Sequence, residues 1–256
     1  IRHIKTPNYN FNFSVDEKYL TNLDNVGFTH FSLANNHSYD YGMEGYLNAN
    51  TAFKNNNLIS FGNPNEISTS SIEILELANS RIALIGINLV EKAIDLNQVT
   101  NVLEYASENS DFQIIYVHWG DEYKLTQSNE QRELATMFVE AGADLIIGHH
   151  PHVTQGVEKI GNALVFYSLG NFIFDQYFST SVQEGLMVSV FPTSATSMEL
   201  MISGITSKYG LAQPKLMSDI EQDIFMQSIA DRSSESVKNS VLTAKFILNT
   251  PLATSS

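Results

Sequence analysis

Apolar and polar residues alternate along the chain in blocks that predict strands and helices in turn. The stretch FTHFSLA, residues 28–34, is short and rich in apolar residues, which favours a strand. Residues 43–56 place Met43, Leu47 and Phe53 on one helical face, and residues 95–109 show the same spacing. FQIIYV (112–117) and DLIIG (144–148) have the length of buried strands. This order predicts an α/β fold with a mostly parallel sheet.

Capping signals predict where two helices begin. Ser14 stands three residues before Glu17, and Ser128 three before Gln131, so each pair predicts a capping box. The first of these helices is expected to end at Gly27. Its predicted apolar face consists of Val15, Tyr19, Leu20, Leu23 and Val26.

Turn signals divide the other strands. Asn79-Ser80 separates two apolar runs, and Gly161-Asn162 separates QGVEKI from ALVFYS, so each predicts a hairpin. Two more strands are expected between residues 184 and 204, followed by helical residues over 218–248. We therefore expect one domain over residues 1–216 and a helical C-terminal tail over residues 217–256.

Composition narrows the classes of function. The chain has 256 residues, with 14 Lys plus Arg against 28 Asp plus Glu and a formal net charge of −14. Such a charge repels nucleic acid, so no nucleic-acid partner is expected. The sequence lacks cysteine, so a metal would need His, Asn, Asp or Glu ligands. No apolar run approaches the roughly 20 residues of a transmembrane helix, and the chain as given is expected to be soluble.

Histidines gather in loops that follow predicted strands. NNHSYDYG places Asn36 and His37 after one strand, HWGDEY places His118 after another, and GHHPHV (148–153) supplies three more. The carboxyl ends of parallel strands meet at one edge of a sheet, so these loops should converge. Imidazole and carboxamide ligands suit Zn, Mn, Fe or Mg, and a pair of such ions about 3.5–4 Å apart can hydrolyse phosphoesters.

Roles can be assigned to these side chains. His37 stands beside a candidate ligand, where a general acid for the leaving group belongs, and Asp40 could orient its imidazole. The structural alternative is that each histidine is only hydrogen-bonded, and that Asp40 closes its loop. The candidate metal ligands are Asn36, His118, His149, His150 and His152.

Other residues of these loops are candidates for lining a substrate pocket. An acidic pair after a strand is equally often solvated, and the apolar FIF of LGNFIFDQ (169–176) more often packs than binds. The candidate lining residues are Trp119, Asp121, Glu122, Asn171 and Asp175.

The motifs SLANNHSYDYG, VHWGDEY, AGADLIIGHHPHVTQGVE and FYSLGNFIFDQ occur in this order over roughly residues 14–216. They resemble the motifs of the CapA family of capsule-synthesis proteins, which is associated with poly-γ-glutamate capsule production and related to calcineurin-like metallophosphoesterases. The resemblance implies a layered sandwich of two mixed β-sheets flanked by helices. It also implies a hydrolase with two divalent metal ions (Mn, Zn, Fe or Mg) that acts on a phosphorylated or polyanionic substrate.

The same resemblance implies roles for individual residues. Asn36 and His118 correspond to metal ligands, and His37 corresponds to the general acid. The His-x-His ligand pair falls on His150 and His152, with His149 left open as an alternative.

One departure from the family concerns the beginning of the chain. The Gly-Asp motif and the Asn-Leu-Glu segment that open family members are not found, and the first acidic residue is Asp16. We expect an N-terminally incomplete chain; the alternative is a degenerate site that holds at most one metal.

The resemblance further implies a cell-envelope or extracellular location and membrane capsule-synthase partners. A second hypothesis is therefore a non-catalytic envelope protein that binds capsule polymer or synthase. The net charge of −14 disfavours binding of a polyanionic polymer without metal.

Overall fold

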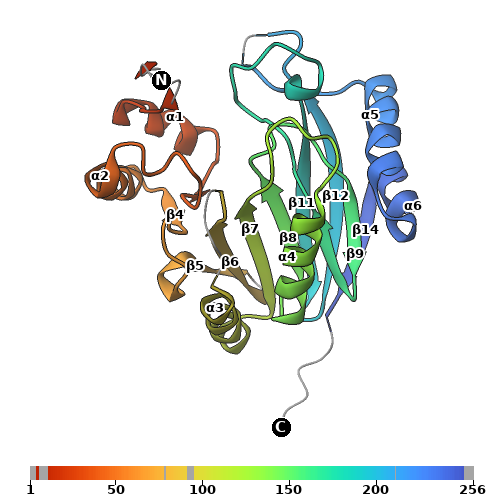
Figure 1. The fold of residues 1–256 in the computed structure, drawn as a ribbon, viewed down its shortest axis with the longest axis horizontal. Coiled ribbons are helices and arrows are strands. Elements are labelled where there is room, and N and C mark those ends of the chain that lie inside the picture. The colour runs from red at the N-terminus through yellow and green to blue at the C-terminus, as the bar shows by residue number, and fades with distance from the viewer. Residues whose placement is uncertain (1–3, 6–10, 78, 91–94, 211, 251–256) are drawn as a thin grey trace.

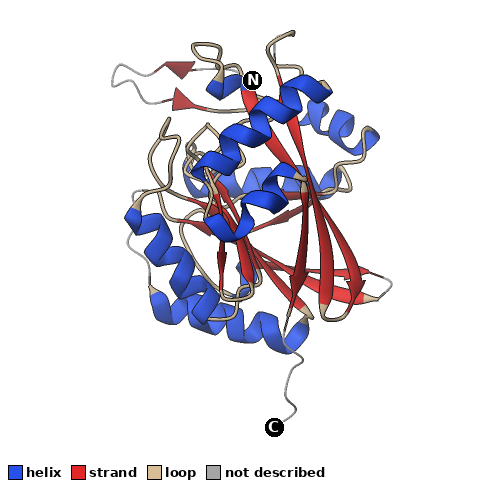
Figure 2. Cartoon of the chain, turned by 90° about the vertical axis from the view of Figure 1, so that its right-hand side faces the viewer, coloured by secondary structure: helices blue, strands red, loops and turns tan. Residues whose placement is uncertain are grey.

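Two β-sheets with helices outside them form the core of the molecule (Figures 1 and 2). The computed structural model describes residues 4–5, 11–77, 79–90, 95–210 and 212–250. The larger sheet has the order β5 (Ile72–Leu77), β6 (Ser80–Asn88), β7 (Phe112–His118), β8 (Leu145–His149), β10 (Ala163–Phe166), β9 (Val157–Ile160). Strands β6, β7, β8 and β10 are parallel, and β5 and β9 pair antiparallel at the edges. The predicted α/β class and the mostly parallel sheet are confirmed.

The smaller sheet is antiparallel in all its described pairs. It contains β11 (Glu184–Ser194), β12 (Ser197–Thr206), β13 (Lys215–Leu216) and β14 (Lys245–Asn249). It therefore differs from the second mixed sheet that was predicted. The reason is local, because a short turn joins β11 to β12 and only antiparallel strands can be joined in that way.

The larger sheet is buried on both faces. Ile82 and Leu84 belong to the core shared with the smaller sheet, whereas Ala83 and Ile85 belong to a second core with the helices. Those helices are α3 (Leu96–Asn109) and α4 (Asn129–Glu140), and Figure 1 shows α4 in front of the larger sheet. Burial on both faces explains why these strands are nearly continuous apolar runs. The predicted capping box of α4 is confirmed.

The C-terminal elements are part of this core. Helix α5 (Asp219–Arg232) buries Phe225, Met226 and Ile229 against the sheets, and α6 (Lys238–Leu242) packs on it. Strand β14 pairs with β12. The predicted helical tail thus contains a strand as well, with buried Phe246 and Leu248 on one face.

Residues 11–61 form a separate layer beside the larger sheet, which we call the N-terminal layer (Figure 1). It contains α1 (Leu20–Asn25), β3 (His30–Ser32), α2 (Gly42–Asn55) and β4 (Ile59–Phe61), with β3 and β4 parallel. The predicted second helix is confirmed, but Met43 and Leu47 on its expected inner face are exposed. The remaining short elements are β1 (Ile4–Lys5), β2 (Phe11–Asn12), η1 (Glu17–Tyr19), η2 (Thr69–Ser71), η3 (Ser181–Gln183) and η4 (Glu235–Val237).

The first helix begins later than predicted. The side chain of Asp16, rather than that of Ser14, caps the preceding 3-10 turn by accepting a hydrogen bond from the Lys18 N–H at 3.1 Å. An aspartate at this position satisfies an end N–H as well as serine does, so the turn starts two residues further on. Val15 and Tyr19 are consequently exposed.

Two glycines bring the N-terminal layer against the larger sheet. A Cβ placed on Gly86 of β6 would lie 2.8 Å from the Cα of Gly62, so only glycine permits this approach. Nearby, the Asn88 side chain donates a hydrogen bond to the Pro64 carbonyl at 3.0 Å. Of the helices that the structure describes, none combines the length and apolar content needed to cross a bilayer.

Candidate metal centre

The carboxyl ends of three strands bring the predicted ligands together. His118 is the last residue of β7, and Asn36 lies in the loop that follows β3. Although 82 residues separate them, the His118 Nε2 and Asn36 Oδ1 atoms are 2.9 Å apart. The expected convergence of these loops therefore occurs, and it joins the N-terminal layer to the larger sheet.

His37 and Asp40 form a hydrogen-bonded pair beside this contact. The His37 Nδ1 lies 3.1 Å from Oδ2 and 3.3 Å from Oδ1 of Asp40. Asp40 Oδ2 also accepts the Phe13 N–H at 2.8 Å, and the Asp40 side chain is only 10% exposed. A carboxylate held in this way accepts the Nδ1 proton and leaves the Nε2 atom of His37 for chemistry. The predicted orienting role of Asp40 fits this geometry.

The segment after β8 turns sharply and gathers two histidines. His150 (φ +96°) and His152 (φ +60°) occupy the left-handed region that non-glycine residues rarely adopt, a strain that is typical of functional sites. The ring centroids of His118 and His150 are 4.9 Å apart, and those of His150 and His152 are 6.0 Å apart. Ligand atoms of Glu122, His150 and His152 all lie within 4.8 Å of one another. These three side chains can share one cation.

Asn171 fixes the orientation of His152. The Asn171 amide nitrogen donates to the Val182 carbonyl at 3.0 Å and to the Gln176 side chain at 3.1 Å. Its oxygen is therefore the acceptor that faces the His152 Nδ1 at 2.9 Å. The Nδ1 atom carries the proton, and the Nε2 lone pair is free to bind a metal. Asn171 was predicted to line a substrate pocket. In the structure it orients a candidate metal ligand instead.

His149 is placed differently from the two histidines that follow it. It is the last residue of β8, next to His118 in parallel register, and its ring stacks on Tyr116 at 6.1 Å. Burial lowers the pKa of His149 to about 4, so the imidazole is neutral. Between the two alternatives for the His-x-His pair, the geometry favours His150 and His152.

The protein environment favours the neutral form of two candidate ligands, His118 and His150. Burial lowers the pKa of His118 well below its usual value, and the nearby His150 lowers it further. Burial likewise lowers the pKa of His150, opposed by the charge of Glu122. Neutral imidazole is the form that binds metals.

Trp119 does not line the site as predicted. It is 1% exposed, it stacks on Phe138 and Tyr167, and its indole N–H donates to the Tyr167 carbonyl at 2.9 Å. The backbone stays extended after His118, and successive side chains of an extended chain point to opposite faces. The Trp119 side chain therefore points away from the side chain of His118 and into the core with the helices. Of the other predicted lining residues, Asp121 and Asp175 are exposed. Glu122 lies with His150 and His152, and we call these three residues the histidine cluster.

Aromatic residues around the histidines were missed by sequence reasoning. Phe13 contacts His37, and Tyr123 and Phe174 contact His152. The FIF stretch was the available signal for Phe174, but it was interpreted as packing. The approach of Phe13 depends on the fold and has no local signal.

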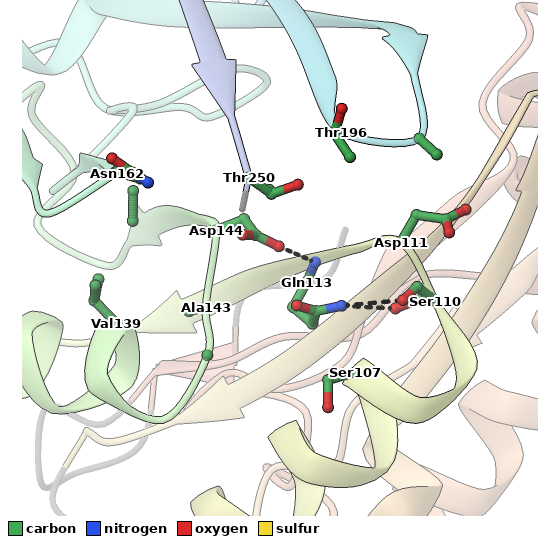
Figure 3. A pocket seen from close by; sticks show the side chains of 13 residues that line it. Ser107, Ser110, Asp111, Gln113, Val139, Ala143, Asp144, Asn162, Thr196 and Thr250 are labelled. Carbon is green, nitrogen blue, oxygen red and sulfur yellow. Dashed lines mark hydrogen bonds between the residues drawn. The ribbon is translucent and has the colours of Figure 1, made fainter. Parts of the chain in front are cut away.

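A concavity of about 630 Å³ lies at the amino ends of β7, β8 and β10 (Figure 3). The Asp144 carboxylate on its wall accepts the Gln113 N–H at 2.8 Å, and burial raises the pKa of Asp144 to about 6. Asp111 is also on this wall. The concavity lies at the opposite end of the strands from the histidines and is separate from the candidate metal centre.

Comparison with known proteins gives a family match. A family model described as bacterial capsule synthesis protein PGA_cap matches residues 2–176. The capsule biosynthesis protein CapA of Bacillus anthracis is 33% identical over 196 residues, covering 70% of this chain and 48% of that protein. The PGA biosynthesis protein CapA of Bacillus subtilis (strain 168) is 31% identical over 169 residues, covering 60% and 44%. The chain spans about half the length of these curated relatives.

Solved structures show only a distant likeness. A putative 5'-nucleotidase from Staphylococcus aureus aligns with a TM-score of 0.46 and 12% identity, covering 79% of this chain and 39% of that one. A hypothetical protein from Thermus thermophilus aligns with a TM-score of 0.44 and 11% identity, covering 78% and 79%.

Proposed function

The chain belongs to the bacterial capsule synthesis protein PGA_cap family, and from this premise we propose that it is a metal-dependent phosphoesterase of capsule biosynthesis. One observation carries the proposal. His37 and Asp40 of the N-terminal layer form what we call the acid pair. The contact between Asn36 and His118 places this pair beside the histidine cluster of the larger sheet. A general acid beside a cluster of nitrogen and oxygen ligands suits metal-dependent phosphoester hydrolysis.

The donor atoms fit divalent cations. Glu122, His150 and His152 offer one carboxylate and two imidazoles, and Asn36 with His118 offers an amide oxygen and an imidazole. We propose that these two sets hold two ions of the Mn, Zn, Fe or Mg type, with His150 close to both sets. When bound, the ions supply Lewis-acid chemistry, because they activate water and neutralise charge on the phosphoryl oxygens.

The chain's own residues supply proton transfer and orientation. In its doubly protonated form, His37 keeps its Nδ1–H on the Asp40 carboxylate and donates its Nε2 proton to the leaving oxygen. Asn171 keeps the His152 tautomer that presents Nε2 to the cluster. Local cationic charge also offsets the net charge of −14, which would otherwise repel an anionic substrate.

The biological setting is proposed from the relatives. The two CapA proteins are named for capsule and PGA biosynthesis. We place this chain in poly-γ-glutamate capsule production at the cell envelope, with membrane capsule-synthase proteins as partners and a phosphorylated substrate.

Hydrolysis of aryl and alkyl phosphates with added Mn²⁺ tests the activity. The wild-type chain is expected to show metal-stimulated turnover, and the His118→Ala/His150→Ala double variant is expected to lose it by a factor of about 10³ or more. His37→Ala should retain metal. It should lose about 10² in kcat with the alkyl phosphate but much less with p-nitrophenyl phosphate, whose leaving group needs no proton. Equal turnover by the wild type and the double variant would refute the activity.

The names of the relatives also support a second function. They state a role in capsule biosynthesis without naming a reaction, which suits a non-catalytic protein that binds polymer or synthase. Polymer binding by the double variant, together with no turnover by the wild type, would favour this function.

A further inference from the structure

Aromatic rings from three separate segments stand beside the candidate metal centre. They are Phe13 of the N-terminal layer, Tyr123 after β7, and Phe174 and Phe178 of the loop between β10 and β11, and we call them the aromatic wall. The Phe13 ring meets His37 edge-on at 4.5 Å, and the Phe174 ring lies 5.0 Å from His152. The wall therefore contacts both the acid pair and the histidine cluster.

The members of the wall also contact one another across the site. Phe13 and Phe174 are 6.3 Å apart between ring centroids, and Tyr123 and Phe178 are 5.1 Å apart. Tyr123 stacks on His152 at 5.9 Å. Rings from distant parts of the sequence therefore converge on the proposed general acid and on a candidate metal ligand.

Two of the four rings of the wall are exposed to solvent. Tyr123 is 42% exposed and Phe178 is 66% exposed. Such rings are usually buried in a core, so their exposure beside a polar centre calls for an explanation.

Polar anchors hold the wall in place. The Gln176 side chain donates to the Tyr123 hydroxyl at 3.0 Å and accepts from the Asn171 amide at 3.1 Å. Asn171 is the residue that orients His152. The position of the wall is thus fixed relative to a candidate metal ligand.

Two acidic side chains of the Tyr123 loop lie near the histidines of the centre. Glu122 precedes Tyr123 and lies 3.9 Å from His152, and the charges of Glu122 and Asp121 both act on His150. Beyond the phosphate, therefore, a substrate meets rings and negative charge. An uncharged ring fits this environment, whereas further anionic groups are repelled.

We propose that the aromatic wall binds the alcohol portion of the substrate, and that this portion is a neutral cyclic group. The inference rests on the proposed phosphoesterase function and narrows its substrate class to phosphate esters of uncharged ring-bearing alcohols. The flat faces of the rings contact the cyclic group while the phosphate is held at the metal centre.

Binding of phosphonates to the Mn²⁺-loaded chain tests the wall without requiring turnover. Calorimetry should show that phenylphosphonate binds roughly 10-fold more tightly than methylphosphonate, which has the same headgroup without a ring. The anionic 2-carboxyethylphosphonate should bind more weakly than methylphosphonate. Phe174→Ala should reduce the phenyl preference to about 2-fold, and Phe174→Tyr should retain it.

A matched control comes from the smaller sheet. Phe191 of β11 is 49% exposed and faces away from the core, so Phe191→Ala should leave the phenyl preference unchanged. Equal affinity for phenylphosphonate and methylphosphonate would overturn the wall and leave the phosphoesterase function standing. Tighter binding of the carboxyethyl compound would overturn the preference for neutral groups. If no phosphonate bound to the metal-loaded chain, both the wall and the proposed function would fail.

Discussion

The N-terminal layer and the two sheets with their helices, which we call the body, both contribute residues to the candidate metal centre. Their packing is very different. Helices α2 and α3 both have 14 residues; α2 has no buried residue, whereas α3 buries Val99, Val102, Leu103 and Ala106. The body therefore holds His118 and the GHHPHV segment on buried strands. The layer presents Asn36, His37 and Asp40 from a thinly packed region. The position of His37 and Asp40 relative to the histidines of the body therefore depends on the contact between the layer and the larger sheet.

The largest expected difference between the two regions is in stability. Leu103→Ala in α3 should lower the free energy of unfolding by about 2–5 kcal/mol, because it leaves a cavity in a packed core. Leu47→Ala in α2 removes a side chain that is 55% exposed and should cost less than about 0.5 kcal/mol. Urea unfolding of both variants gives the comparison. Similar costs for the two changes would show that the layer is as tightly packed as the body.

The glycine contact between the regions should control activity. In Gly86→Ala, the new methyl group meets the Cα of Gly62, so the backbone must shift and the layer must move away from the sheet. Because a displacement of about 1 Å can cost 10²-fold in rate, we expect kcat/KM for an alkyl phosphate to fall by about 10- to 100-fold. Gly161→Ala, at the hairpin turn between β9 and β10, places its Cβ in open space but strains the backbone at φ +57°. It therefore serves as the control for backbone strain without a steric clash. Unchanged kcat/KM in Gly86→Ala would show that activity does not depend on the contact between the layer and the sheet.

A smaller effect is expected at the far end of the body. Burial raises the pKa of Asp144 to about 6 from an ordinary value of 3.8, so the folded state holds this proton more tightly than the unfolded state. The chain should therefore lose stability as pH rises from about 4 to about 6. Asp144→Asn removes this cost and keeps an acceptor for the Gln113 N–H.

Chemical unfolding at two pH values measures this effect. We expect the gain in unfolding free energy caused by Asp144→Asn to be larger at pH 7.5 than at pH 4.5, by on the order of 1 kcal/mol. The difference is small because partial exposure to solvent screens the carboxylate. An identical effect of the substitution at both pH values would contradict the assignment. Metal binding should not change, because this concavity lies at the other end of the strands.

The sequence predicted those parts of the molecule that follow from local pattern. Buried apolar runs located the parallel strands, and histidines directly after them located the candidate ligands, because strand ends converge whatever the remaining fold. Strand β14 was missed although KFILN alternates buried Phe246 and Leu248 with exposed residues. The adjoining helical pattern obscured this short period-2 signal.

Other features depended on tertiary contacts. Trp119 follows a candidate ligand in sequence, yet its side chain fills the core behind the sheet. Phe13 reaches Asp40 and His37 from 27 and 24 residues away, a contact that no local pattern encodes. Exposure of Met43 and Leu47 was also unpredictable, because helical spacing shows that an apolar face exists but not whether another element covers it.

Metal content per chain, measured by elemental analysis after loading with Mn²⁺ and dialysis, tests most directly whether the two regions form one metal centre. The account predicts about two ions in the wild-type chain. It predicts a clear loss in Asn36→Ala, from the layer, and in His118→Ala, from the body, but none in the buried neighbour variant His149→Gln. Retention of the full metal content in both Asn36→Ala and His118→Ala would contradict the shared centre.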